Sequence, residues 1–195
     1  MTLYRPDGIV CIMRNSGDKT KARILDAANK VLMEKGVEGF TLEMVALEAG
    51  VSKGGLLYHY PSKKQLIQGM IERMIAKVDA ALEEELIKSN GDYLSAYIHA
   101  SFRTTTEPEK LSYALFAAIA NEPDLIEPLR SRFYKIQDRL SSVADVQPEI
   151  ATLIRLSLDG LWLSDLHGFS PPSVEMRLKM KDALLEIYKN NKSLS

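Results

Sequence analysis

The segment 41–64 gathers side chains that can bind an anion and form hydrogen bonds with a flat polar surface. Lys53 and Lys63 supply positive charge, while Tyr58 and His59 are aromatic rings that also form hydrogen bonds. Lysines pair with phosphate oxygens, and polar side chains of this kind also reach the edges of nucleic-acid bases. These residue types therefore suit contacts with a sugar-phosphate strand.

Two short helices joined by a tight turn, over residues 42–61, are expected to position these side chains. Gly50 stands at the corner, where a positive φ angle would penalise a side chain, and Ser52 can cap the second helix. Gly54 and Gly55 each cost about 1 kcal/mol relative to alanine in a helix, which makes sense where backbone approaches a partner closely. The pattern is typical of a helix-turn-helix, whose second helix enters the major groove of DNA. The plainer alternative is a capped helical hairpin with exposed polar groups.

The helix ends agree with this interpretation. Thr41 is a candidate N-cap without a reciprocal capping box, whereas the sequence SKKQ at 62–65 fits that box and predicts a helix over 62–88. Lys63 and Lys64 then fall in the first turn of this helix, where positive charge opposes the helix dipole. Either an external anion or solvent could relieve that conflict.

The sequence GVSKGGLLYHYPSKKQLI resembles the recognition helix and the start of helix four in the TetR family of bacterial transcriptional regulators, and TKARILDAANKVLMEKGVEGFTLEMVALEAGV resembles the first two helices. The clear similarity covers roughly residues 18–75. Leu57 stands where many members have tyrosine, and Tyr60 stands where most have phenylalanine. The DNA contacts that the resemblance implies are Thr41, Ser52, Lys53, Gly54, Gly55, Leu57, Tyr58, His59 and Lys63.

Composition fits a globular regulator with two parts. The 195 residues are 46% hydrophobic and carry a net charge of only −1, which argues against indiscriminate binding of nucleic acid. Residues 1–64 hold ten Lys or Arg against seven Asp or Glu, and the rest hold fifteen against nineteen. A mildly basic head on an acidic body suits an anion-binding module attached to another domain. Together with the family resemblance, this implies a DNA-binding domain at 18–64 and an effector-binding and dimerisation domain at 65–195.

Residues 1–17 are interpreted as a flexible tail. Alternatively, Arg5 and Arg14 could form an arm that reaches into a minor groove, and Met13 could be the natural start. The single cysteine, Cys11, favours a cytoplasmic location, since it cannot form a disulfide within one chain. No apolar run approaches the ~20 residues that span a bilayer.

Helical periodicity and turn residues predict an all-α fold. Ile24, Ala27 and Ala28 begin the apolar stripe of a first helix, which Gly36 ends. The helix at 62–88 would be about 40 Å long, so it can belong to both domains. Further helices are predicted at 92–105, 109–120, 124–142 and 148–167, with a last one that ends near 190.

The last two helices carry more apolar surface than one core needs, and a helix that is apolar on most sides is buried on most sides. In the TetR family this pair packs against its two-fold mate as a four-helix bundle. A dimer also lets two recognition helices reach major grooves about 34 Å apart. The alternative is a single monomer core. One apolar face of 148–167 carries Ile150, Leu153, Ile154, Leu158, Leu161 and Trp162, and another carries Leu156, Leu163 and Leu166. The interface residues expected are Leu156, Gly160, Leu163, Val174, Leu178 and Leu185.

An aromatic pocket roofed by methionines would suit a small apolar or amphipathic organic effector. Plain core packing is the alternative for each of these residues. Asp159 and His99 are the polar groups that could orient a ligand, and Asp159 needs a partner if it is buried. The three histidines and one cysteine show no metal-binding spacing, so neither a metal nor a cofactor is expected. The candidate lining residues are Met70, Met74, His99, Phe102, Phe116, Asp159 and Trp162.

The function expected from these features is that of a homodimeric repressor that a small effector releases from a palindromic operator. Activation instead of repression is open. A second alternative is a DNA-binding dimer without an effector, controlled by a protein partner or serving architecture. A third is an enzyme that uses Asp159 and His99, although the sequence shows no nucleophile-base pairing, phosphate loop or metal signature for it.

Overall fold

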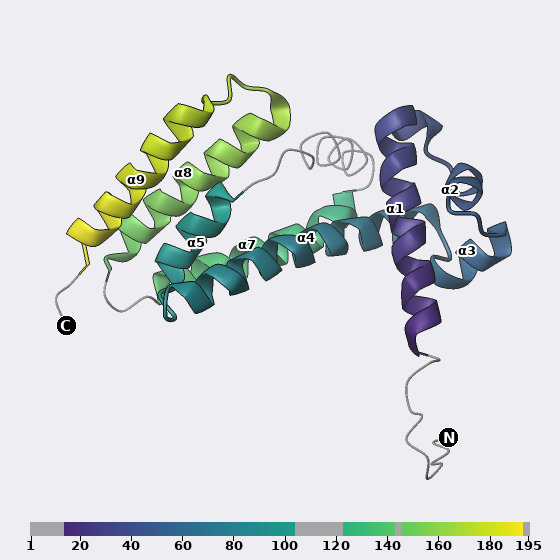
Figure 1. Ribbon diagram of the computed structural model, residues 1–195, viewed down its shortest axis with the longest axis horizontal. Coiled ribbons are helices and arrows are strands. Elements are labelled where there is room, and N and C mark those ends of the chain that lie inside the picture. The colour runs from purple at the N-terminus through teal and green to yellow at the C-terminus, as the bar shows by residue number, and fades with distance from the viewer. Residues whose placement is uncertain (1–13, 104–122, 143–145, 193–195) are drawn as a thin grey trace, which may run out of the picture. The chain divides into compact units, whose positions relative to one another are not determined.

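The computed structural model describes residues 14–103, 123–142 and 146–192 (Figure 1). Across these ranges the regular secondary structure is helical, with a single isolated β-bridge in addition. The all-α prediction is therefore confirmed. The helix predicted at 109–120 lies outside the described residues.

The chain divides into two compact units between Met70 and Ile71. The first unit contains α1 (Arg14–Gly39), α2 (Leu42–Glu48), α3 (Lys53–His59) and the beginning of α4 (Lys63–Lys88), which continues into the second unit. Helix α1 starts at Arg14, so the four residues 14–17 of the expected tail are helical. Gly36 breaks α1 with φ 67°, as its position in the sequence predicts.

Apolar residues of α1, α2 and α3 form the core of the first unit, and α2 packs against both of the other helices (Figure 1). Leu56 of α3 is completely buried, as are Val45 of α2 and Phe40. At the start of α4, Ser62 accepts a hydrogen bond from the Gln65 amide at 3.1 Å, which is one half of the predicted capping box.

Gly69 brings α4 close to the end of α3. A Cβ atom at this position would lie 2.7 Å from Cε1 of Tyr60, so any side chain would collide with the tyrosine ring. The aromatic ring of Tyr60 therefore packs against a surface of α4 that has no side-chain atoms at position 69.

The second unit contains the rest of α4 together with α5 (Tyr93–Phe102), the 3-10 turn η1 (Pro123–Ile126), α7 (Glu127–Ser141), α8 (Pro148–His167) and α9 (Val174–Asn190). Helix α8 has the predicted bounds. The helix predicted at 124–142 begins instead as η1, and Pro128 lies in the first turn of α7. Helices α8 and α9 run side by side as a hairpin, and α5 packs on both (Figure 1).

Only some residues of the apolar face of α8 that contains Leu153 belong to the core of the second unit. Ala151, Ile154, Leu158 and Leu161 are buried, but Leu153 is 60% exposed. Leu153 and Leu156 are three positions apart, so both lie on the same exposed side of the helix.

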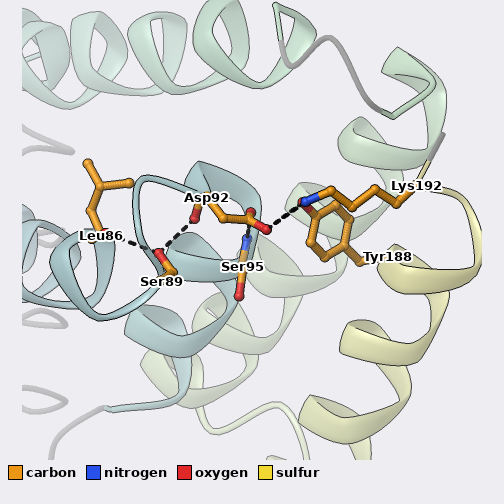
Figure 2. Close-up of polar contacts among 6 residues, drawn as sticks. All are labelled: Leu86, Ser89, Asp92, Ser95, Tyr188 and Lys192. Atoms are coloured by element: carbon orange, nitrogen blue, oxygen red, sulfur yellow. Dashed lines mark hydrogen bonds and ion pairs between the residues drawn. The ribbon is translucent and has the colours of Figure 1, made fainter. Parts of the chain in front are cut away.

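The corner between α4 and α5 is tied to the end of α9 by one carboxylate (Figure 2). Asp92 caps α5 by accepting a hydrogen bond from the Ser95 amide at 3.0 Å. Its other oxygen accepts from the Tyr188 hydroxyl at 2.7 Å and from the Lys192 ammonium at 3.1 Å. Ser89 closes the turn by donating to carbonyl oxygens on either side of it. A side chain at one corner thus holds segments that lie nearly 100 residues apart.

Candidate nucleic-acid interface and effector site

Two side-chain caps and one glycine set the geometry of the α2–turn–α3 segment. Thr41 caps α2 by accepting from the Met44 amide at 3.2 Å, and Ser52 caps α3 by accepting from the Gly55 amide at 3.0 Å. Gly50 adopts φ 61° at the corner, a conformation that side chains disfavour. The predicted helix-turn-helix geometry is therefore present, with Leu56 as its buried anchor.

The opposite face of α3 is open. Tyr58 is 84% exposed, and its ring meets that of half-buried His59 edge-on at 5.1 Å. A Cβ atom added at Gly54 would meet nothing within 4 Å, whereas one at Gly55 would lie 3.2 Å from the Ser52 hydroxyl. Leu57 is half-buried. Gly54 therefore leaves bare backbone on the accessible side, while Gly55 makes room for the cap.

Both cations proposed from the sequence already have partners within the first unit. The Lys53 ammonium lies 2.5 Å from the carboxylate of Glu43 on α2. Lys63 donates to the carbonyl oxygen of Val37 at 3.4 Å and lies 5.5 Å from the ring centroid of Phe40. Both partners of Lys63 are neutral and its side chain stays exposed, so its charge remains accessible to an anion or to solvent. No sequence pattern indicates either arrangement, because the partners lie on different elements.

Asp159 has the partners that its apolar neighbours in the sequence require. Its carboxylate pairs with Arg155 one turn earlier on α8 and accepts a hydrogen bond from the Tyr97 hydroxyl of α5 at 3.4 Å. Arg155 also donates to Gln137 of α7 at 2.6 Å. Burial raises the pKa of Asp159, and burial followed by the nearby Asp159 charge raises the pKa of Tyr97. Three helices thus meet at one partly buried polar cluster.

His99 does not join this cluster. Tyr97 and His99 are two residues apart, so they project from different sides of α5. His99 instead lies within electrostatic reach of Glu85 on α4; the pKa of Glu85 is lowered chiefly by its hydrogen bond from Lys88. An enzyme that used both Asp159 and His99 would need them close together, and the structure does not bring them together.

The other candidate lining residues are distributed over both units. Met70 is 2% exposed and closes the first unit, while Met74 is half-buried on α4 in the second. Trp162 is half-buried, with its ring 6.4 Å from that of Phe133. Phe102 packs on the core of the second unit. Phe116 lies outside the described residues.

Apolar residues of α8 and α9 are exposed, and we call the set of Leu156, Leu163, Val174 and Leu178 the exposed stripe. Leu156 is 51% and Leu163 44% exposed, and Gly160 between them has open space beside it. On α9, Val174 is 77% and Leu178 57% exposed. Further exposed apolar residues on these two helices are Leu153, Met176 and Ile187.

Leu185 departs from the interface expected for it, because it packs on the core of the second unit together with buried Tyr188. One ion pair joins α8 to α9 across the hairpin. The Arg177 guanidinium on α9 binds both carboxylate oxygens of Asp165 on α8, one of them at 2.9 Å. Its third nitrogen donates to the Pro172 carbonyl at 3.0 Å.

The described residues contain no group of three or more His, Cys, Asp or Glu side chains that could hold a metal ion. Among the helices described, none is both long and apolar enough to cross a membrane.

Known families match both units. Residues 24–70 match the family described as "Bacterial regulatory proteins, tetR family", and residues 91–189 match "Tetracyclin repressor-like, C-terminal domain". The first match contains α2, α3 and their caps. The second contains the polar cluster and the exposed stripe.

The first three relatives described next have low sequence identity to this chain, but they match most of its length. IcaR of Staphylococcus aureus, a negative transcriptional regulator of a biofilm operon, is 25% identical over 73% of this chain and 82% of its own. A transcriptional regulator from Rhodococcus has the same fold, with a TM-score of 0.70, 24% identity and coverage of 90% of this chain and 98% of its own. The multidrug binding protein EbrR, complexed with malachite green, gives a TM-score of 0.63 at 21% identity and covers 86% of this chain and 96% of its own. The chain spans only 25% and 40% of two curated regulators from Pseudomonas putida that match its N-terminal part.

Proposed function

The chain belongs to the TetR family of bacterial regulatory proteins, and on this basis we propose that it is a dimeric transcriptional repressor that a small organic effector releases from DNA. The observation that carries this proposal is the open face of α3. A helix that is anchored by Leu56 on one side and leaves Tyr58 and bare backbone on the other fits the major groove.

The proposed DNA contacts divide by chemistry. The hydroxyl oxygen of Thr41 accepts the bond that caps α2, so its proton is available to a phosphate oxygen. Lys53 and Lys63 are proposed phosphate partners, and Tyr58 and His59 are placed to meet base edges. The remaining proposed contacts, made by backbone or short side chains, are Ser52, Gly54, Gly55 and Leu57.

The proposed dimer forms through α8 and α9. Isolated exposed leucines are ordinary, but a stripe that runs along two packed helices is typical of a binding surface. Two-fold symmetry places the same stripe on both partners, with Gly160 where helices can approach closely. Leu156, Leu163, Val174 and Leu178 form the centre of this interface; Leu185 supports it from beneath.

The proposed effector is a small apolar or amphipathic organic molecule that binds in the second unit. The multidrug binding protein EbrR, which has the same fold, forms a complex with malachite green, and this supports the proposed class of ligand. The cluster of Asp159, Arg155 and Tyr97 supplies polar groups that could orient it. Since α4 belongs to both units, a ligand that favours one position of α4 changes the spacing of the recognition helices.

The test is binding of the purified protein to the duplex upstream of its own gene, measured by fluorescence anisotropy, with a scrambled duplex of equal length as control. We expect tight binding to the first duplex, a steep loss of affinity with salt, and release by at least one compound that raises the melting temperature. Equal binding to both duplexes at every salt concentration would contradict a specific repressor. A specific complex that no stabilising compound weakens would contradict release by an effector.

A further inference from the structure

The pair between Lys53 and Glu43 cancels the only full positive charge on α3. Helix α3 has the sequence KGGLLYH, in which Lys53 is the sole lysine or arginine. Its ammonium lies 2.5 Å from the Glu43 carboxylate, and both side chains remain more than half exposed. The hydrogen bond from Lys53 is the main cause that lowers the pKa of Glu43, so the two groups attract each other as charges.

Stability does not account for this pair. Exposed ion pairs contribute little to folding, because water screens the charges and ordering two long side chains costs entropy. The same first unit shows another way to hold a lysine. Lys63 is bound by the carbonyl of Val37 and the ring of Phe40, neither of which carries a charge that would offset it. Lys53 alone of these two is held by an anion.

We propose that Glu43 limits sequence-independent DNA binding by competing with backbone phosphates for the Lys53 ammonium. The inference rests on the proposed function. Non-specific affinity comes almost entirely from cation–phosphate contacts, and a genome offers a vast excess of non-specific sites. A carboxylate already bound to Lys53 removes one such contact from every random encounter. At the operator, contacts with base edges add affinity that offsets the cost of separating Lys53 from Glu43, so Lys53 can then contact a phosphate as proposed above.

The experiment compares Glu43→Gln with Glu48→Gln. Glu48 is the matched control because it also lies on α2 and also pairs with an exposed lysine, Lys30, at 2.7 Å. Lys30 belongs to α1 and not to the recognition helix. Both variants remove one charge of the same sign, so a general change in the field of the protein would affect them equally. Circular dichroism melts confirm that both variants fold.

Binding to a scrambled duplex is measured across a salt series. At about 0.1 M salt we expect Glu43→Gln to bind about five- to tenfold more tightly than wild type, with a log–log salt slope steeper by about 0.9. Glu48→Gln should behave as wild type. The double variant Glu43→Gln/Lys53→Met should lose the gain, because the gain requires a lysine that phosphate can reach.

Three outcomes overturn the inference but leave the proposed function intact. Equal gains in Glu43→Gln and Glu48→Gln would assign the effect to net charge. A gain that survives removal of Lys53 would place the competition elsewhere. Weaker binding of Glu43→Gln to the operator alone would mean that Glu43 accepts from a base, as glutamate can from cytosine. Indifference of wild type and all variants to both duplexes would be a failure of the proposed function itself, and the inference would fall with it.

Discussion

Replacing Asp92 tests whether a single carboxylate holds the α4–α5 corner to the end of α9. Asp92→Asn keeps a side-chain oxygen that can cap α5, but it cannot accept both the Tyr188 and Lys192 hydrogen bonds as a carboxylate does. Asp92→Ala removes the cap as well. The difference between the two variants therefore separates the cap from the contacts with α9.

The expected magnitudes follow from the contacts. Losing an N-cap costs about 1 kcal/mol, and losing a hydrogen bond to a charged group costs about 1.5–3 kcal/mol. Lys192 is 40% exposed, so its pairing adds little to the hydrogen bond from Tyr188. We expect the free energy of unfolding at pH 7 to fall by about 2 kcal/mol in Asp92→Asn and about 3 kcal/mol in Asp92→Ala.

The pH dependence gives an independent check. Burial alone would raise the pKa of Asp92, but hydrogen bonds from Ser95, Tyr188 and Lys192 together hold it below the ordinary value of 3.8. A carboxyl with a depressed folded pKa stabilises the protein fully above its unfolded pKa, and that contribution disappears as pH falls through the folded pKa. The difference between wild type and Asp92→Asn should therefore be constant near neutrality and shrink below about pH 4.

The assay is urea unfolding, followed by circular dichroism and by the fluorescence of Trp162, at a fixed protein concentration. Tyr188→Phe is the companion variant, and its cost combined with that of Asp92→Asn should be less than additive because both remove the same hydrogen bond. An Asp92→Asn protein within about 0.5 kcal/mol of wild type at pH 7 would refute the assigned role of the carboxylate.

Three further outcomes are expected. Lys63→Ala should make the salt slope of operator binding shallower by about 0.9, measured by anisotropy, and an unchanged slope would remove Lys63 from the DNA contacts. Leu163→Glu should weaken dimerisation by about tenfold or more in sedimentation experiments, whereas Tyr134→Glu, at a position that is 72% exposed on α7, should not; equal behaviour would argue against the proposed interface. Gly69→Val should lower stability by about 1–3 kcal/mol through collision with Tyr60, and an unaffected urea midpoint would show that the ring can move aside.

Local features were predictable from sequence where a residue acts on its own neighbours. Thr41 and Ser52 cap the helices expected of them, because a cap bonds an amide only three residues away. Gly50 adopts the positive φ that its corner position indicates. The bounds of α8 follow from Pro148 at its start and Gly168, in the left-handed conformation, at its end.

Pairings between elements were not predictable in the same way. Nothing in the order of residues distinguishes Glu43 from Glu48 as the partner of Lys53, since the choice depends on how α3 leaves the turn. Leu153 was assigned to the wrong face because α8 is apolar on two stripes, and periodicity alone cannot say which is buried. On α9 the sequence pattern likewise does not show that Leu185 packs on the core of the second unit.

The missing side chain at position 69 has a consequence for protein engineering. Changing the operator preference of a regulator by transplanting residues 52–60 from a relative also transplants whatever aromatic ring stands at position 60. That ring must pack against Gly69, nine residues further along the chain on α4, which the transplanted segment does not include. A bulkier or differently tilted ring from the donor will collide with α4 and displace the transplanted helix. Successful chimeras should therefore exchange positions 60 and 69 as one unit.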